Sequence, residues 1–177
     1  MTNFINFITI ARIILAPIII VFLIFGHYLI CLILFFLAGL SDYFDGYLAR
    51  RYNAESQLGE ILDPIADKIL VVFILFGLSV ELNSFLMALL SSFIIAREIG
   101  IAALRDYSSR KNIASRTKVT YLAKIKTSVQ LFSIGLYLFA LTISFNLLII
   151  IGDIFLIIAT LITLYTGYEY TLKVFKK

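Results

Sequence analysis

The sequence has no tryptophan, one cysteine and one histidine, and only 15% of its residues are charged. A single cysteine excludes a disulfide within the chain, and Cys31 is expected to be a buried apolar residue. Without a cluster of cysteine and histidine, a zinc site is not expected. Because tryptophan is absent, an aromatic belt at a membrane interface would have to come from the ten tyrosines.

Apolar residues dominate what is present. They make up 62% of the 177 residues, and the mean hydropathy is +1.03, far above that of soluble domains. This composition predicts an all-α integral membrane protein, with membrane lipids rather than nucleic acid as its surroundings. We expect one domain over residues 1–177, because no repeat or linker divides the chain. A cleavable signal peptide is not expected, since Arg12 interrupts the first apolar run.

Polar breaks divide the apolar residues into six predicted transmembrane helices. The expected ranges are 8–26, 28–51, 61–80, 84–105, 119–143 and 147–173. All fifteen lysines and arginines lie outside the connections 26–28, 80–84 and 144–147. By the positive-inside rule, these three connections face outward, so both termini are expected in the cytoplasm.

Four of the predicted helices carry a charged residue at a similar depth. Arg12, Asp42, Asp67 and Arg97 each lie 13 or 14 residues from the outer end of their helix. At about 1.5 Å per residue, they are about 20 Å from the outer surface, or roughly 10 Å inside the inner edge of a ~30 Å core. Charges gathered in one layer predict a polar cavity, surrounded by the six helices and open to the cytoplasm.

The densest group of these charged residues forms a regular pattern. It reads Asp42-x2-Asp45-Gly46-x2-Ala49-Arg50-x8-Gly59-x3-Asp63-x3-Asp67. Spacings of three and four residues place each aspartate pair on one helix face, and the short connection lets the two pairs face each other. Four carboxylates beside apolar spans need a compensating charge. We therefore predict that they bind Mg²⁺ or Mn²⁺, with two ions expected, because these cations prefer oxygen ligands.

The aspartates allow two other interpretations. Asp63 followed by Pro64 is typical of a helix start, and Asp42 and Asp45 could simply pair with arginines at a helix end. Membrane carboxylates also mark ion paths through transporters. Clustering at one depth, with no acidic residues beyond it, argues against such a path.

A second group of charges suggests a phosphate-bearing ligand. Arg97 and Arg105 lie eight residues apart, about 80° around one helix, so both can border one cavity. Lys124 and Lys126 begin the next helix. These cations favour an acceptor with its own phosphate, such as sn-glycerol 3-phosphate. The alternatives are that Arg97 pairs with a carboxylate in the membrane and that the lysines are positive-inside anchors.

The aspartate pattern resembles the signature of the CDP-alcohol phosphatidyltransferase family, and all eight of its specified identities match. Segments 6–12, 96–105 and 124–127 resemble the bacterial phosphatidylglycerophosphate synthases of that family. Ala123 departs from this resemblance, because glycine is usual there. The added methyl group bears on the shape of the acceptor pocket.

The resemblance implies transfer of a phosphatidyl group from CDP-diacylglycerol to sn-glycerol 3-phosphate, with release of CMP. It implies a homodimer in a bacterial inner membrane, with the active site on the cytoplasmic side. Inositol phosphate or phosphatidylglycerol as acceptor, or a cation transporter, remain alternatives.

The implied base is Asp67. The implied metal ligands are Asp42, Asp45, Asp63 and Asp67. Binding of CDP-diacylglycerol is expected at Gly46, Ala49, Arg50 and Gly59. Binding of the acceptor is expected at Thr9, Arg12, Arg97, Arg105, Lys124 and Lys126.

Overall fold

The computed structural model describes residues 2–52, 57–111 and 121–175. Side chains are described for residues 7–41, 44, 59, 61–111, 122 and 125–175. This part of the chain forms six α-helices, which are α1 (Thr2–Ile24), α2 (Tyr28–Tyr52), α3 (Gln57–Glu81), α4 (Phe85–Arg110), α5 (Tyr121–Ile143) and α6 (Asn146–Phe175).

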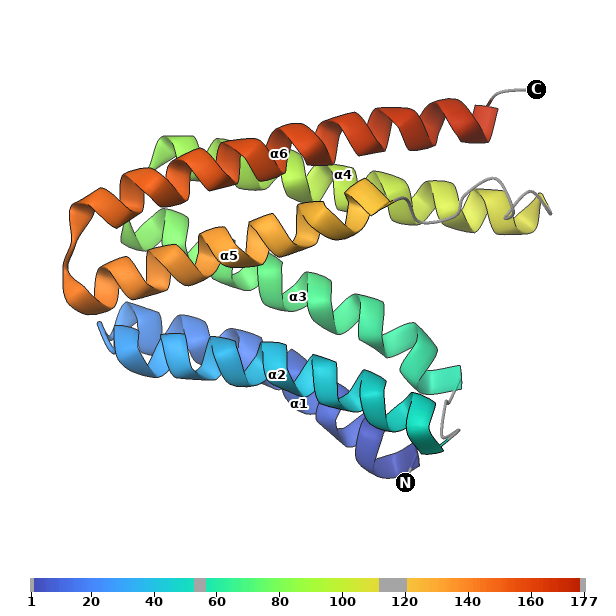
Figure 1. Ribbon diagram of the computed structural model, residues 1–177, viewed down its shortest axis with the longest axis horizontal. Coiled ribbons are helices and arrows are strands. Elements are labelled where there is room, and N and C mark those ends of the chain that lie inside the picture. The colour runs from blue at the N-terminus through green and yellow to red at the C-terminus, as the bar shows by residue number, and fades with distance from the viewer. Residues whose placement is uncertain (1, 53–56, 112–120, 176–177) are drawn as a thin grey trace.

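The helices run alternately in opposite directions along a common axis (Figure 1). The connections α1–α2, α3–α4 and α5–α6 lie together at one end of the bundle, and both termini lie at the other. This arrangement confirms the predicted grouping of the three connections that contain no lysine or arginine. Each contains one residue with positive φ: Gly26 at 73°, Asn83 at 46° and Ser144 at 54°. Such a conformation ends a helix sharply, so a two- or three-residue turn suffices to reverse the chain.

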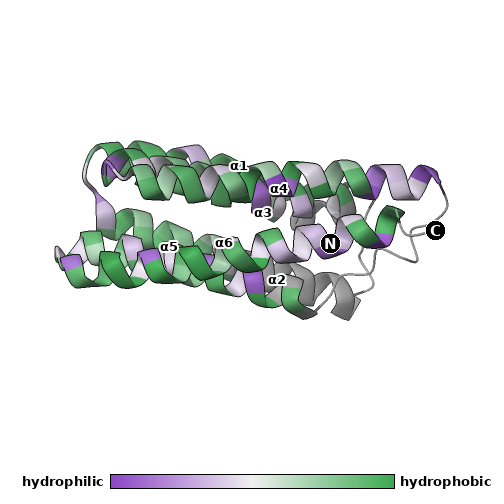
Figure 2. Cartoon of the chain, turned by 90° about the horizontal axis from the view of Figure 1, so that it is seen from above, coloured by the Kyte–Doolittle hydropathy of each residue, from purple (hydrophilic) through white to green (hydrophobic). Residues whose placement is uncertain are grey.

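Within the described residues, four segments are long and apolar enough to cross a membrane. They are Phe7–Ile24, Phe85–Arg110, Ile125–Ile143 and Asn146–Phe175. The apolar part of α2, Tyr28–Ser41, is shorter. Figure 2 shows apolar residues along most of the length of α5 and α6. The prediction of an all-α chain with six helices is thus confirmed, and four of the six predicted spans are long and apolar enough to cross a membrane among the described residues.

The bundle consists of two groups of helices. One group packs α1 against α2 and α3, and the other packs α6 against α4 and α5. Contacts of α2 with α5, and of α3 with α4 and α5, join the two groups. Cys31 is fully buried in the apolar core, as predicted, and its thiol donates to the carbonyl of Ile19 at 3.4 Å.

The α5–α6 hairpin depends on a glycine. A Cβ on Gly152 would lie 2.9 Å from Cε1 of Tyr137, whose hydroxyl donates to Asp153 at 2.6 Å. We expect Gly152→Ala to lower the free energy of unfolding by about 1–3 kcal/mol, because the core there has no room for a methyl group. Thermal unfolding in detergent measures this. Gly100→Ala is the control, since nothing lies within 4 Å of that added Cβ. Equal unfolding temperatures for the two variants would contradict the packing argument.

Candidate active site

Two polar contacts join α1 to α3. The hydroxyl of Thr9 donates to Oδ1 of Asp63 at 2.8 Å, and a guanidinium nitrogen of Arg12 donates to Oδ1 of Asp67 at 2.6 Å. The spacing of three residues on α1 and four on α3 places both contacts on facing helix surfaces. Arg12 is 1% exposed, whereas the side chain of Asp67 is 52% exposed. Asp67 is therefore anchored by a buried cation while it remains accessible.

These contacts overturn one alternative interpretation of the sequence. Asp63 and Pro64 do not start a helix, because α3 begins at Gln57 and Pro64 lies inside it. The carboxylate of Asp63 accepts a hydrogen bond from a neighbouring helix instead.

A cavity of about 1010 Å³ lies between α1, α2, α3, α4 and α5. Its wall includes Arg12 and Asp67. Along α5 the wall changes from Lys126 and Gln130 to Leu136 and Phe139, so its polar part lies toward the end that holds the termini. Apolar residues of α2 and α3 continue the wall beside the apolar part of α5. The cavity is therefore amphipathic, as a site for a lipid with a charged headgroup must be.

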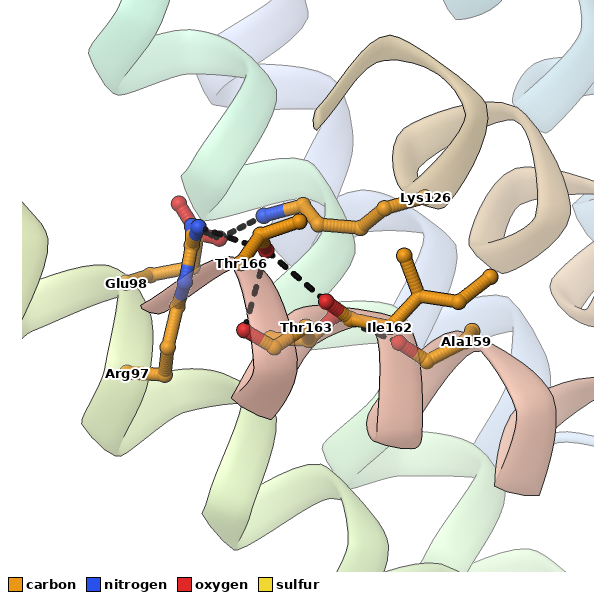
Figure 3. A network of polar contacts seen from close by, with 7 residues as sticks. All are labelled: Arg97, Glu98, Lys126, Ala159, Ile162, Thr163 and Thr166. Atoms are coloured by element: carbon orange, nitrogen blue, oxygen red, sulfur yellow. Dashed lines mark hydrogen bonds and ion pairs between the residues drawn. The ribbon is translucent and has the colours of Figure 1, made fainter. Parts of the chain in front are cut away.

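Glu98, which also lines this cavity, is the centre of a polar network (Figure 3). Its Oε1 accepts from Arg97 of the same helix at 2.9 Å and from Nζ of Lys126 on α5. Arg97 also donates to Oγ1 of Thr166 on α6 at 3.0 Å. The side chains of Arg97, Glu98 and Lys126 are 12%, 21% and 7% exposed. Two cations share one carboxylate, so these three groups carry a formal charge of +1.

A sequence profile of the CDP-alcohol phosphatidyltransferases matches residues 2–165. The chain belongs to the CDP-alcohol phosphatidyltransferase family. Three relatives bear the name CDP-diacylglycerol–glycerol-3-phosphate 3-phosphatidyltransferase. The protein from Blochmanniella floridana is 37% identical over 95% of this chain and 88% of its own. That from Rickettsia typhi is 36% identical over 96% of each chain, and that from Haemophilus influenzae is 33% identical over 93% and 89%. The predicted family is thus confirmed.

Several of the predicted site residues lie on α2 or α5 with side chains outside the described part of the chain. They are Asp42, Asp45, Gly46, Ala49, Arg50 and Lys124. Gly59 is described and is buried in α3. Among the described side chains, no three or more His, Cys, Asp or Glu residues are close enough to hold a metal ion. Asp63 and Asp67 supply hard oxygen donors on one helix face, and such donors fit Mg²⁺ or Mn²⁺. Because the side chains of Asp42 and Asp45 are not described, the metal site formed by all four aspartates stays a prediction.

The predicted acceptor residues are divided between the cavity and its surroundings. Arg12 and Lys126 line the cavity, and Thr9 contacts Asp63 beside it. Arg97 and Arg105 are not among the described lining residues; Arg105 lies over the ring of Tyr170 at 6.0 Å.

Sequence reasoning did not propose Lys68, Glu98, Thr127 or Gln130 as site residues, and all four line the cavity. A polar residue four positions after Lys126 on the same apolar helix was the available signal for Gln130.

Proposed function

We propose that this chain transfers the phosphatidyl group of CDP-diacylglycerol to sn-glycerol 3-phosphate, giving phosphatidylglycerophosphate and CMP. The observation that carries the proposal is the exposed carboxylate of Asp67 in the wall of an amphipathic cavity that also contains Lys126. The names of the relatives support both substrates. The apolar part of the wall suits the acyl chains, and the polar part suits the reacting phosphates.

Asp67 is the proposed general base. Its carboxylate takes the proton of the attacking hydroxyl as the new oxygen–phosphorus bond forms, and the bond to CMP breaks in line. Arg12 holds this carboxylate through Oδ1, so the base stays oriented. The hydroxyl of Thr9 orients the carboxylate of Asp63 in a similar way, by a hydrogen bond from a neutral donor. Fixing the base on a rigid helix supplies part of the rate acceleration through positioning.

The proposed metal ligands are the four aspartates Asp42, Asp45, Asp63 and Asp67. Bound Mg²⁺ or Mn²⁺, with two ions expected, would neutralise charge on the diphosphate. Gly46, Ala49, Arg50 and Gly59 are the proposed residues for the cytidine diphosphate.

Lys126 is the proposed contact to the phosphate of the acceptor, because it is a cation in the cavity wall within a network of net positive charge. Lys124 and Arg105 remain further candidates for the same anion. Arg12 serves the acceptor indirectly, through Asp67. Ala123, which stands where glycine is usual in the bacterial phosphatidylglycerophosphate synthases, directly precedes Lys124. We propose the same acceptor in spite of this difference.

The wider setting is also a proposal. We propose six spans with both termini in the cytoplasm. We also propose an active site that faces the cytoplasm of a bacterial inner membrane, and a homodimer. The first two are supported by the grouping, at one end of the bundle, of the three connections that contain no lysine or arginine.

Release of CMP from CDP-diacylglycerol tests the proposed function. Purified protein is incubated with the lipid, Mg²⁺ or Mn²⁺ and one of several alcohols: glycerol 3-phosphate, inositol phosphate, phosphatidylglycerol or glycerol. CMP is expected with glycerol 3-phosphate alone. CMP with inositol phosphate or phosphatidylglycerol instead would replace the acceptor and keep the chemistry. Absence of CMP with every alcohol, together with cation flux in vesicles, would support a transporter.

A further inference from the structure

Helix α6 contributes none of the described residues that line the cavity, yet it holds the polar network beside it. We propose that α6 sets the affinity for the phosphate-bearing acceptor: Thr166 and Gly167 hold Arg97, Arg97 fixes Glu98, and Glu98 positions Lys126. In this proposal, which rests on the proposed function, Arg97 and the α6 residues are positioning residues rather than groups that contact substrate.

The first step is the contact between α6 and Arg97. The hydroxyl of Thr166 donates to the carbonyls of Ile162 at 2.8 Å and Thr163 at 3.1 Å, which turns its lone pairs outward (Figure 3). Its oxygen therefore accepts the hydrogen bond from Arg97 at 3.0 Å. This contact fixes one end of the guanidinium group.

Gly167 provides the space for the rest of the Arg97 side chain. A Cβ at this position would lie 3.0 Å from Cγ and 3.2 Å from Nε of Arg97. The Nε atom is buried and has no hydrogen-bond partner among the described residues. The side chain is thus held by close packing along its length and by hydrogen bonds at its tip, so it has little freedom to swing into the cavity.

The second step is the sharing of Glu98 between two cations. Its Oε1 accepts from both Arg97 and Lys126, so Arg97 takes up part of the negative charge that Lys126 would otherwise neutralise. Lys126 has three N–H donors, and an ammonium group whose carboxylate is shared retains attraction for an anion. If Arg97 moved away, the Lys126–Glu98 pair would become formally neutral, and its attraction for a phosphate would fall.

Thr166→Val is the test, with Thr163→Val as the matched control. Valine keeps the shape of threonine and removes the acceptor for Arg97. The hydroxyl of Thr163, one turn earlier and also buried, donates only to the carbonyl of Ala159 among its described contacts. Thr166→Val is expected to raise KM for glycerol 3-phosphate about threefold to tenfold, because it removes the charge-assisted hydrogen bond between Arg97 and Thr166. Arg97 is linked to Lys126 through Glu98. KM for CDP-diacylglycerol and kcat should stay unchanged, as should all three values in Thr163→Val.

Two further variants separate the contact from a general packing defect. Thr166→Ser retains the hydroxyl and should restore the KM for glycerol 3-phosphate. Gly167→Ala should raise that KM as well, because its methyl group displaces Arg97, whereas Gly100→Ala should not. Equal increases in the KM values for both substrates, or no rescue by serine, would overturn the inference.

Chemical labelling of Lys126 provides a readout that needs no turnover. The purified protein is treated with a small amine-acylating reagent, and modification is measured by mass spectrometry, with the exposed Lys111 as internal reference. The labelling rate of Lys126 relative to Lys111 is expected to change in Thr166→Val and not in Thr163→Val. An unchanged relative rate would overturn the positioning of Lys126 by α6. If the rate changes while the wild type releases no CMP with glycerol 3-phosphate, the proposed acceptor fails and the positioning is supported.

Discussion

Asp67→Asn is expected to lower the rate of CMP release about a thousandfold or more, because an amide cannot take the proton of the attacking hydroxyl. The substitution is close to isosteric, and the amide oxygen can still accept the hydrogen bond from Arg12 that Oδ1 accepts in the wild type. The rate is measured with saturating CDP-diacylglycerol and glycerol 3-phosphate. Because Asp67 is also a proposed metal ligand, KM for CDP-diacylglycerol is expected to rise as well, and kcat at saturation reports the loss of the base.

The fold of this variant needs its own measurement. Arg12 is 1% exposed, and a neutral partner leaves its charge less well compensated. Thermal unfolding and gel filtration should therefore show a folded protein of somewhat reduced stability. Asp106→Asn is the control, since Asp106 is exposed and pairs with Arg110 at 2.9 Å on the surface of α4. Turnover of Asp67→Asn within tenfold of this control would remove Asp67 as the base.

Depth along each helix could be predicted from the sequence. Arg12 and Asp67 were placed in one layer by counting residues from the ends of their helices, and the structure brings these two side chains into contact. Counting works because the rise per residue is constant and the three short connections fix one end of every helix. The apolar runs likewise predicted all six helices, although α1 begins at Thr2 rather than 8, α3 begins at Gln57 rather than 61, and α4 ends at Arg110 rather than 105.

Rotation of each helix about its axis could not be predicted in the same way. Arg97 and Glu98 are adjacent, so their side chains point about 100° apart, and a small rotation of the helix decides which of them faces the cavity more directly. The sequence favoured Arg97 as a cavity residue, but the structure turns Glu98 to the cavity and Arg97 to α6. The choice depends on Gly167, 70 residues away, where the missing side chain leaves space for the arginine. Such a fit between distant segments has no signature in one sequence.

Local signals were also overridden by packing. Asp63 followed by Pro64 favours a helix start, because the aspartate can cap the helix and proline needs no N–H partner in the first turn. In the structure the carboxylate of Asp63 is used by Thr9 on α1 instead, and α3 continues toward its N-terminus beyond it. The described role of the Asp63 carboxylate is thus a contact with α1 rather than a cap on α3.

Removal of divalent cations is expected to abolish CMP release by the wild type, with a loss of at least about a hundredfold, because the charge on the diphosphate of CDP-diacylglycerol and on the leaving CMP would then be uncompensated. EDTA treatment followed by dialysis prepares the metal-free protein, and Mg²⁺ or Mn²⁺ should restore the rate. Zinc is not expected to restore it, because the site consists of oxygen donors.

A binding measurement tests whether the divalent cations needed for CMP release bind at the aspartates. Because an ion that binds the folded state stabilises it, Mn²⁺ should raise the unfolding temperature of the metal-free wild type. Asp63→Asn should weaken this increase, since it removes a proposed ligand while the amide oxygen can still accept from Thr9. Asp106→Asn, on the exposed surface of α4, should keep the full increase. Full turnover in EDTA, or the same Mn²⁺ stabilisation in Asp63→Asn as in Asp106→Asn, would contradict a metal site at these carboxylates.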